Sequence, residues 1–126
     1  MNTEQLQSRM RTQVEHLKEQ MLGFELMRLA GGKAVEAGEV EGVEMFEAYS
    51  WSMGHDIHIM CDAEILGRCW RRTNNAEDFA MFINQGTVFS SKIGRLAAQC
   101  LLKHYDGIEV SFGTFKDADL ESELSE

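Results

Sequence analysis

The chain has no proline among its 126 residues, and it has only three cysteines. At a usage of about 5%, roughly six prolines are expected in a chain of this length. Without proline, no helix loses an internal hydrogen bond and no X-Pro isomerisation slows folding. Cys61, Cys69 and Cys100 are odd in number and lack paired spacing. Their pattern favours reduced thiols in the cytoplasm over a disulfide framework.

Long hydrophobic runs are missing as well. The longest uncharged run, residues 79–91, includes polar residues and is too short to span a bilayer. The polar N-terminus does not resemble a secretory leader, in which an apolar stretch follows a charged one. We therefore expect one cytoplasmic domain over residues 1–115, followed by an acidic, flexible tail over residues 116–126.

The sequence also lacks the common motifs of catalysis and phosphate binding. It contains no P-loop, no G-x-G-x-x-G and no G-x-S-x-G. Cys61 lies in an acidic stretch, which disfavours the thiolate that a nucleophilic cysteine requires. We therefore predict a protein that is not an enzyme, with no catalytic residue and no cofactor.

One weak pattern of metal ligands leaves an alternative open. Histidines and aspartates gather around a predicted turn, at His55, Asp56, His58 and Asp62. Cys100 and His104 are four residues apart, which places them on one side of a helix. Nitrogen, sulfur and carboxylate donors suit zinc, but no C-x-x-C or H-E-x-x-H accompanies them. We predict no metal, and the alternative is a metal- or ligand-binding enzyme that uses the turn with His55, Asp56 and His58.

Basic residues are absent from residues 34–67, which carry eight acids, and residues 104–126 carry seven acids against one base. The net charge of the whole chain is −9. Such a field repels nucleic acid and anionic membranes and attracts basic surfaces. The residues predicted to bind a basic protein partner are Glu36, Glu39, Glu41, Glu44, Glu47, Asp62 and Glu64.

These charges predict an interaction protein that binds and blocks a basic, nucleic-acid-binding protein, without touching nucleic acid itself. By analogy of composition, it would be an inhibitor of the anti-defence kind that viruses and mobile elements carry. An alternative is a small acidic dimeric chaperone for a basic client, with Tyr49, Trp51 and Met53 exposed. The basic stretch 68–72 surrounds Trp70 and has two interpretations: nucleic-acid stacking, or pairing with the acidic segments.

The first predicted element is a helix over residues 3–30 that ends at Gly31-Gly32, followed by a loop over residues 33–42. Apolar residues follow one another along this helix at spacings of 4-3-4-3, at Met10, Val14, Leu17, Met21 and Phe24. This heptad-like line predicts a homodimer, and the alternative is an ordinary helix face packed in the core.

Alternating patterns predict strands over residues 43–53 and 57–65, joined as a hairpin, and over residues 108–113. The stretch 68–72 would extend the sheet. One further helix is expected to start at the cap Asn75, and another at Thr87 or Ser90 with Gly107 just beyond its end. The apolar face predicted for the latter consists of Ile93, Leu96, Ala97, Cys100 and Leu101. The predicted fold is therefore α+β: a small antiparallel sheet of three or four strands, with the long N-terminal helix and one or two further helices packed on it.

Overall fold

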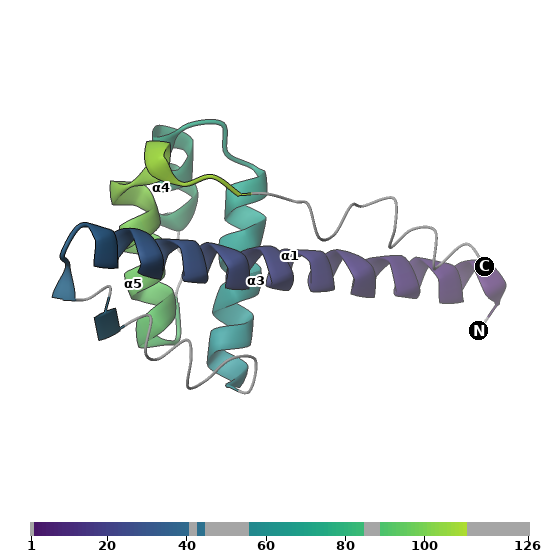
Figure 1. Ribbon diagram of the computed structural model, residues 1–126. Coiled ribbons are helices and arrows are strands. Elements are labelled where there is room, and N and C mark those ends of the chain that lie inside the picture. Colours follow the sequence, from purple (N-terminus) through teal and green to yellow (C-terminus); the bar gives the residue numbers. More distant parts are fainter. Residues whose placement is uncertain (1, 41–42, 45–55, 85–88, 111–126) are drawn as a thin grey trace.

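The computed structural model describes residues 2–40, 43–44, 56–84 and 89–110, and these residues form helices and no strand. The elements are α1 (Thr3–Glu36), α3 (Ile57–Arg71), α4 (Ala76–Asn84), α5 (Lys92–Lys103) and the 3-10 turn η1 (Tyr105–Gly107). The α+β prediction is therefore wrong. Helix α1 lies across α3 and α5, and α4 packs against those two helices (Figure 1). None of the described helices is long and apolar enough to cross a membrane.

The predicted strand 57–65 is the first part of α3. An alternating strand would place Ile57 and Ile59 on the same buried face, but Ile57 is 73% exposed and Ile59 is 5% exposed. Burial in α3 instead follows the helical spacing of Ile59, Ala63 and Leu66. The run of alternating residues was too short to distinguish the two periods.

The two ends of α3 explain why this segment is helical. The Asp56 side chain caps the helix by accepting a hydrogen bond from the backbone N–H of His58 at 2.8 Å. Arg68 and Arg71 occupy the last turn, where positive charge complements the helix dipole. The predicted extension of the sheet over residues 68–72 is therefore wrong, because the helix continues through Arg71.

Helix α1 does not end at Gly31-Gly32 but continues to Glu36, so the first four residues of the predicted loop are helical. Two residues beyond this end lies Gly38, whose φ of 74° is accessible to glycine and stops the helix from continuing. The N–H groups of Gly38 and Glu39 donate to carbonyls three and five residues earlier, at 3.0 and 2.9 Å. This is the hydrogen-bond pattern of a Schellman motif, and it fixes the backbone of Glu39 against the helix end.

Helices α1 and α3 touch through their backbones. A Cβ atom added to Gly23 would lie 1.7 Å from the carbonyl oxygen of Ala63, and one added to Gly67 would lie 2.0 Å from that of Glu19. Only glycine fits at these two positions. By contrast, a Cβ atom added to Gly32 would meet nothing within 4 Å.

The caps of α4 and α5 test two further predictions. Asn75 caps α4, because its Oδ1 accepts a hydrogen bond from the N–H of Asp78 at 2.8 Å; this confirms the predicted start. Ser91 caps α5, one residue after the later of the two predicted positions. Helix α5 ends at Lys103, and Gly107 closes η1, so Gly107 is not the residue that follows the helix.

The core lies where the four helices meet. Its largest fully enclosed side chains are Leu26, Met27, Asp62, Leu66, Phe79 and Leu101. The apolar face predicted for α5 is confirmed in large part, since Ile93, Ala97, Cys100 and Leu101 are buried. Trp70 packs against this core, with its ring 5.5 Å from that of Phe79 and 4.8 Å from that of Tyr105.

Two of the predicted strands lie partly outside the described residues. Val43 and Glu44 are helical, and residues 45–53 are not described. Residues 108–110 form no strand, and residues 111–113 are outside the description, as is the predicted tail 116–126.

Candidate functional site

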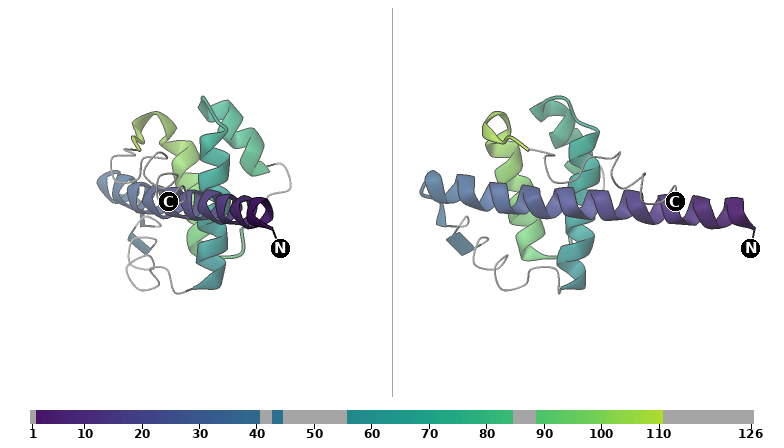
Figure 2. Two further views of the ribbon diagram at one scale, coloured as in Figure 1. Left: turned by 90° about the vertical axis from the view of Figure 1, so that its right-hand side faces the viewer. Right: turned by 45° about the vertical axis from the view of Figure 1, so that its right-hand side comes forward.

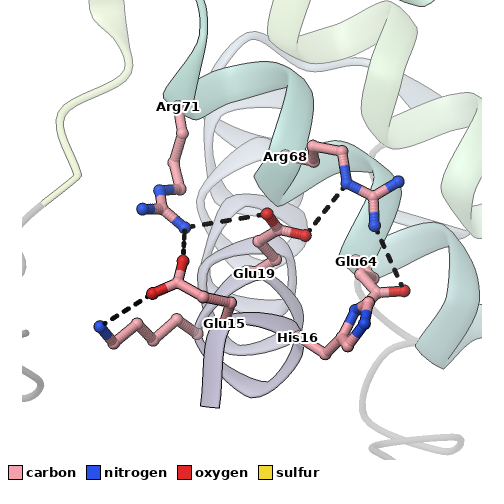
Figure 3. A network of polar contacts seen from close by, with 7 residues as sticks. Glu15, His16, Glu19, Glu64, Arg68 and Arg71 are labelled. Carbon is pink, nitrogen blue, oxygen red and sulfur yellow. Dashed lines mark hydrogen bonds and ion pairs between the residues drawn. The ribbon is translucent and has the colours of Figure 1, made fainter. Parts of the chain in front are cut away.

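Two of the three arginines in the basic stretch 68–72 are paired with glutamates of α1 and α3 (Figure 3). Arg68 Nε lies 3.1 Å from Glu19 Oε2, and Arg68 Nη2 lies 3.7 Å from Glu64 Oε2. Arg71 Nη1 lies 3.1 Å from Glu15 Oε2 and 3.8 Å from Glu19 Oε1. The pairs with Glu15 and Glu19 join α1 to α3 across their contact, and the pair with Glu64 lies within α3.

Further contacts of these residues indicate that the network serves to stabilise the fold. His16 Nδ1 contacts Glu64 Oε1, and Glu15 Oε1 lies 3.3 Å from Lys18 Nζ. The hydrogen bond from Arg71 is the largest cause that lowers the pKa of Glu15 below its usual value. Trp70, which lies within the same stretch, packs against the core. Trp70 therefore does not present an exposed ring, and Arg68 and Arg71 are already paired, which disfavours the stacking and phosphate contacts that bind single-stranded nucleic acid.

Asp62, one of the acids predicted to contact a partner, lies in the core with its side chain fully enclosed. Its Oδ1 accepts a hydrogen bond from Ser90 N at 3.0 Å, and its Oδ2 accepts bonds from Ser91 N at 2.7 Å and Ser91 Oγ at 2.5 Å. A Cβ atom added to Gly94 would lie 2.3 Å from Oδ2. Asp62 therefore holds the start of α5 against α3, and a partner has no access to it.

Glu39 is also engaged within the molecule. Its Oε1 accepts hydrogen bonds from Lys103 Nζ at 2.7 Å and from His104 Nε2 at 2.9 Å. These bonds, first that from Lys103 and then that from His104, hold the pKa of Glu39 below its usual value. Its side chain is 21% exposed, so little of it faces solvent.

Glu36 and Glu44 are the most accessible of the described acids that were predicted to bind a partner. The Glu36 side chain is 74% exposed, and its contact with Lys33 is a long one of 3.9 Å. Glu44 pairs with Lys92 at 3.0 Å, and 54% of its side chain is exposed. Glu41 and Glu47 lie outside the described residues.

The negative charge of the chain is concentrated outside the described residues. The described residues include fourteen of the 21 acids and eleven of the 12 bases, an excess of three negative charges. The other residues carry seven acids and one base, an excess of six. Most of the net charge inferred from the sequence therefore comes from Glu41, Glu47 and the acids of residues 117–126.

The N-terminal half of α1 projects beyond the other helices (Figure 2). Leu6, Met10 and Leu17 are exposed along it, at 51%, 37% and 45%. Helical geometry places Met10 and Leu17 on the side opposite Glu15 and Glu19, which face α3. The remaining residues of the predicted dimer line are half-buried: Val14, Met21 and Phe24.

The structure separates the two halves of the predicted metal pattern. His55 lies outside the described residues, Asp56 caps α3, and His58 is exposed. Cys100 and His104 do come together, and the third possible ligand beside them is Glu39 and not Asp62. The donor atoms of Glu39, Cys100 and His104 all lie within 4.8 Å of one another. Cys100 Sγ donates a hydrogen bond to Ala30 O at 3.2 Å, and burial raises the pKa of its thiol.

A second group of possible metal ligands is His16, Glu19 and Glu64. Arg68 already pairs with both glutamates of this group, so its place is within the ion network. Sequence reasoning missed Glu15, His16 and Glu19 entirely. A signal was available in the sequence. Glu15 and Glu19 are four residues apart and Arg68 and Arg71 are three apart, so each pair lies on one face of its helix and the two faces have opposite charge.

Comparison with known proteins adds no functional assignment. The chain matches no protein-family model, no curated protein and no solved structure. Its function is therefore inferred from the contacts, exposure and charges of its own residues.

Proposed function

We propose that this chain is a non-enzymatic interaction protein that binds a basic, nucleic-acid-binding protein and blocks it. The disposition of the ion pairs supports this proposal. Arg68 and Arg71, in the densest basic stretch, are paired with glutamates, whereas Glu36 is largely exposed at the end of α1. Glu36 is therefore a negative charge that stays available to a partner.

The end of α1 is a suitable place for a cationic partner to dock. Glu36 is the last residue of the helix, where the helix dipole adds partial negative charge. Glu44 follows shortly after, and the intervening Glu41 adds a further acid in the sequence. Complementary charge at such a surface speeds association and orients the partner, and salt weakens both effects. A partner held there would have its own basic surface covered.

Charge reversal tests the proposal. The variant Glu36→Lys/Glu44→Lys should bind the partner about fivefold more weakly or worse, because each exposed ion pair contributes about 0.2–1 kcal/mol and each reversal adds repulsion. The matched control Glu77→Lys/Glu109→Lys changes the net charge equally at exposed sites elsewhere. Retention of proteins from native lysate at low and high salt measures the effect.

The proteins retained at low salt are then identified and tested for nucleic-acid binding with and without the chain. The proposal expects a basic protein that the Glu36/Glu44 variant retains poorly, that the control variant retains normally, and whose nucleic-acid binding the chain inhibits. Equal retention by both variants would contradict the acidic docking site. A partner whose nucleic-acid binding persists would contradict the blocking role.

A second proposal concerns assembly: α1 pairs with α1 of a second copy. Exposure of Leu6, Met10 and Leu17 on the side of α1 that faces away from α3 supports it. Their spacing suits the packing of two helices side by side, and pairing there leaves the contact between α1 and α3 intact.

The other two expected functions have less support. Tyr49, Trp51 and Met53, on which the chaperone hypothesis depended, lie outside the described residues. The enzyme hypothesis depended on the turn with His55, Asp56 and His58, and in the structure Asp56 caps α3. We propose neither function.

A further inference from the structure

Glu39, Cys100 and His104 meet where the C-terminal ends of α1 and α5 come together. The Schellman motif after α1 fixes Glu39, Cys100 lies in the last turn of α5, and His104 is the C-cap residue directly after α5. The carboxylate, thiol and imidazole donor atoms lie within 4.8 Å of one another. Residues far apart in the sequence thus bring three different metal-ligating groups to one point.

These three groups suit a zinc-type divalent cation. Zinc binds thiolate, imidazole and carboxylate together at about 2.0–2.3 Å, which places tetrahedral ligand atoms about 3.3–3.7 Å apart. The present separations require only small side-chain movements to reach that geometry. Three protein ligands leave one position for water, and the soft thiolate selects zinc over magnesium or calcium.

Two properties of the surroundings bear on cation binding by these three side chains. The C-terminal ends of α1 and α5 both direct partial negative charge toward this region. The side chains are also shielded: Cys100 is 7% exposed, and the side chains of His104 and Glu39 are 18% and 21% exposed. Little solvent would therefore reach a cation bound among these side chains.

Lys103 is the group that opposes a cation, since its Nζ lies 2.7 Å from Glu39 Oε1. Its side chain is 65% exposed, so it can turn toward solvent when a cation takes its place. Cation binding would also break the hydrogen bond between Glu39 and His104. The Cys100 thiol would give up its bond to Ala30 O and release its proton to solvent, becoming the thiolate ligand.

We propose that Glu39, Cys100 and His104 bind a zinc-type divalent cation that ties the end of α1 to the end of α5. The cation would be structural, holding together two helix ends that a salt bridge and hydrogen bonds join in its absence. This site is independent of the proposed partner and of the α1 dimer.

Titration of the purified, reduced, metal-free protein with Co²⁺ tests this site, because a cobalt–thiolate bond gives a charge-transfer absorption in the near ultraviolet. Zn²⁺ should abolish that absorption by competition and should raise the thermal unfolding midpoint. Cys100→Ser should remove the absorption, and Glu39→Gln and His104→Ala should weaken binding about tenfold or more. The control Cys61→Ser/His58→Asn removes an exposed cysteine and an exposed histidine on α3 and should change neither result.

Several results would overturn the proposal. One is a wild-type protein without the cobalt–thiolate absorption; another is an absorption that persists in Cys100→Ser or disappears in the α3 control. Circular dichroism of each metal-free variant establishes that it is folded. If Cys100→Ser does not fold, the two other variants decide, since neither substitution alters a buried core side chain: unchanged affinity in both would refute the site.

Discussion

At the scale of single residues, the acids of this chain have different roles that their sequence positions do not reveal. Asp62 is enclosed and organises the start of α5, whereas Glu36 faces solvent. Both lie in the same base-free stretch, and both were predicted to touch a partner. The burial of Asp62 depends on Ser90 and Ser91, which lie 28 and 29 residues further along the chain. No local pattern around Asp62 announces such partners.

Glu15 gives a residue-scale prediction about pH. Its pKa is lowered in the folded state, mainly by the hydrogen bond from Arg71, so its ion pairs stabilise the fold when it is ionised. This contribution is complete well above the usual pKa of 4.5 and is lost as pH falls through the lower, folded-state value. Glu15→Gln should therefore be less stable than wild type at pH 7, by about 1 kcal/mol or less because the pair is partly exposed. The difference should shrink below pH 4.5.

Urea unfolding at pH 7 and pH 3 measures this difference. Glu109→Gln serves as the control, because Glu109 is exposed and lies outside the network. A stability difference between wild type and Glu15→Gln that stays constant with pH would mean that the Arg71 contact does not depend on the charge of Glu15.

At the scale of elements, capping residues were better guides than periodicity. Asn75 was correctly predicted as the cap of α4, whereas the alternation over 57–65 produced a false strand. Asp56 before this stretch and Arg68 and Arg71 near its end are helix-boundary signals, and they outweigh a short period-two run. The prediction that Gly31-Gly32 ends the first helix was wrong. Helix α1 continues through the two glycines because Ala30 and Ala34 on either side of them are buried in the core.

The contact between α1 and α3 supplies an element-scale prediction. Gly67→Ala should lower the free energy of unfolding by about 1–3 kcal/mol or more, because the new methyl group would collide with the Glu19 carbonyl and push the helices apart. Gly32→Ala makes the same chemical change inside α1 at an open position. It should raise the free energy of unfolding by about 0.5–1 kcal/mol, because alanine is the better helix former.

Chemical denaturation of both variants at neutral pH gives the two values directly. If Gly67→Ala were as stable as wild type, the backbones of α1 and α3 could not approach as closely as they do here. If Gly32→Ala were destabilised, α1 would not be a regular helix at that point.

At the scale of the whole molecule, the projecting half of α1 determines the prediction about assembly. Leu17→Asp should convert a dimer to a monomer, because it places a charge within the exposed apolar line of Leu6, Met10 and Leu17. Met81→Asp is the matched control: Met81 is also exposed, at 49%, but it lies on α4. Light scattering over a range of concentrations measures the mass of each variant. Wild type that is monomeric throughout, or Leu17→Asp that remains dimeric, would exclude pairing through this line.

The sequence predicted single helices better than the contacts between them. The long N-terminal helix and much of the apolar face of α5 were predicted, because both follow from local spacing. The assembly of Glu39 with Cys100 and His104 was not, since it requires knowing that the ends of α1 and α5 meet. The pairing of Arg68 and Arg71 with acids of the same chain was predicted only as one of two alternatives, because it requires knowing that α1 and α3 meet.

Helix α1 is a single element by its hydrogen bonds, yet its two halves depend on different sources of order. Its 34 residues span about 51 Å, and its buried residues fall between Leu22 and Ala34. Backbone amides in that half should exchange with deuterated solvent only when the whole domain opens. Amides of residues 3–13, all of them exposed, are held by helix propensity and the Asn2 cap, so they should exchange through local fraying. A partner that binds this half would reveal itself by slowing that exchange.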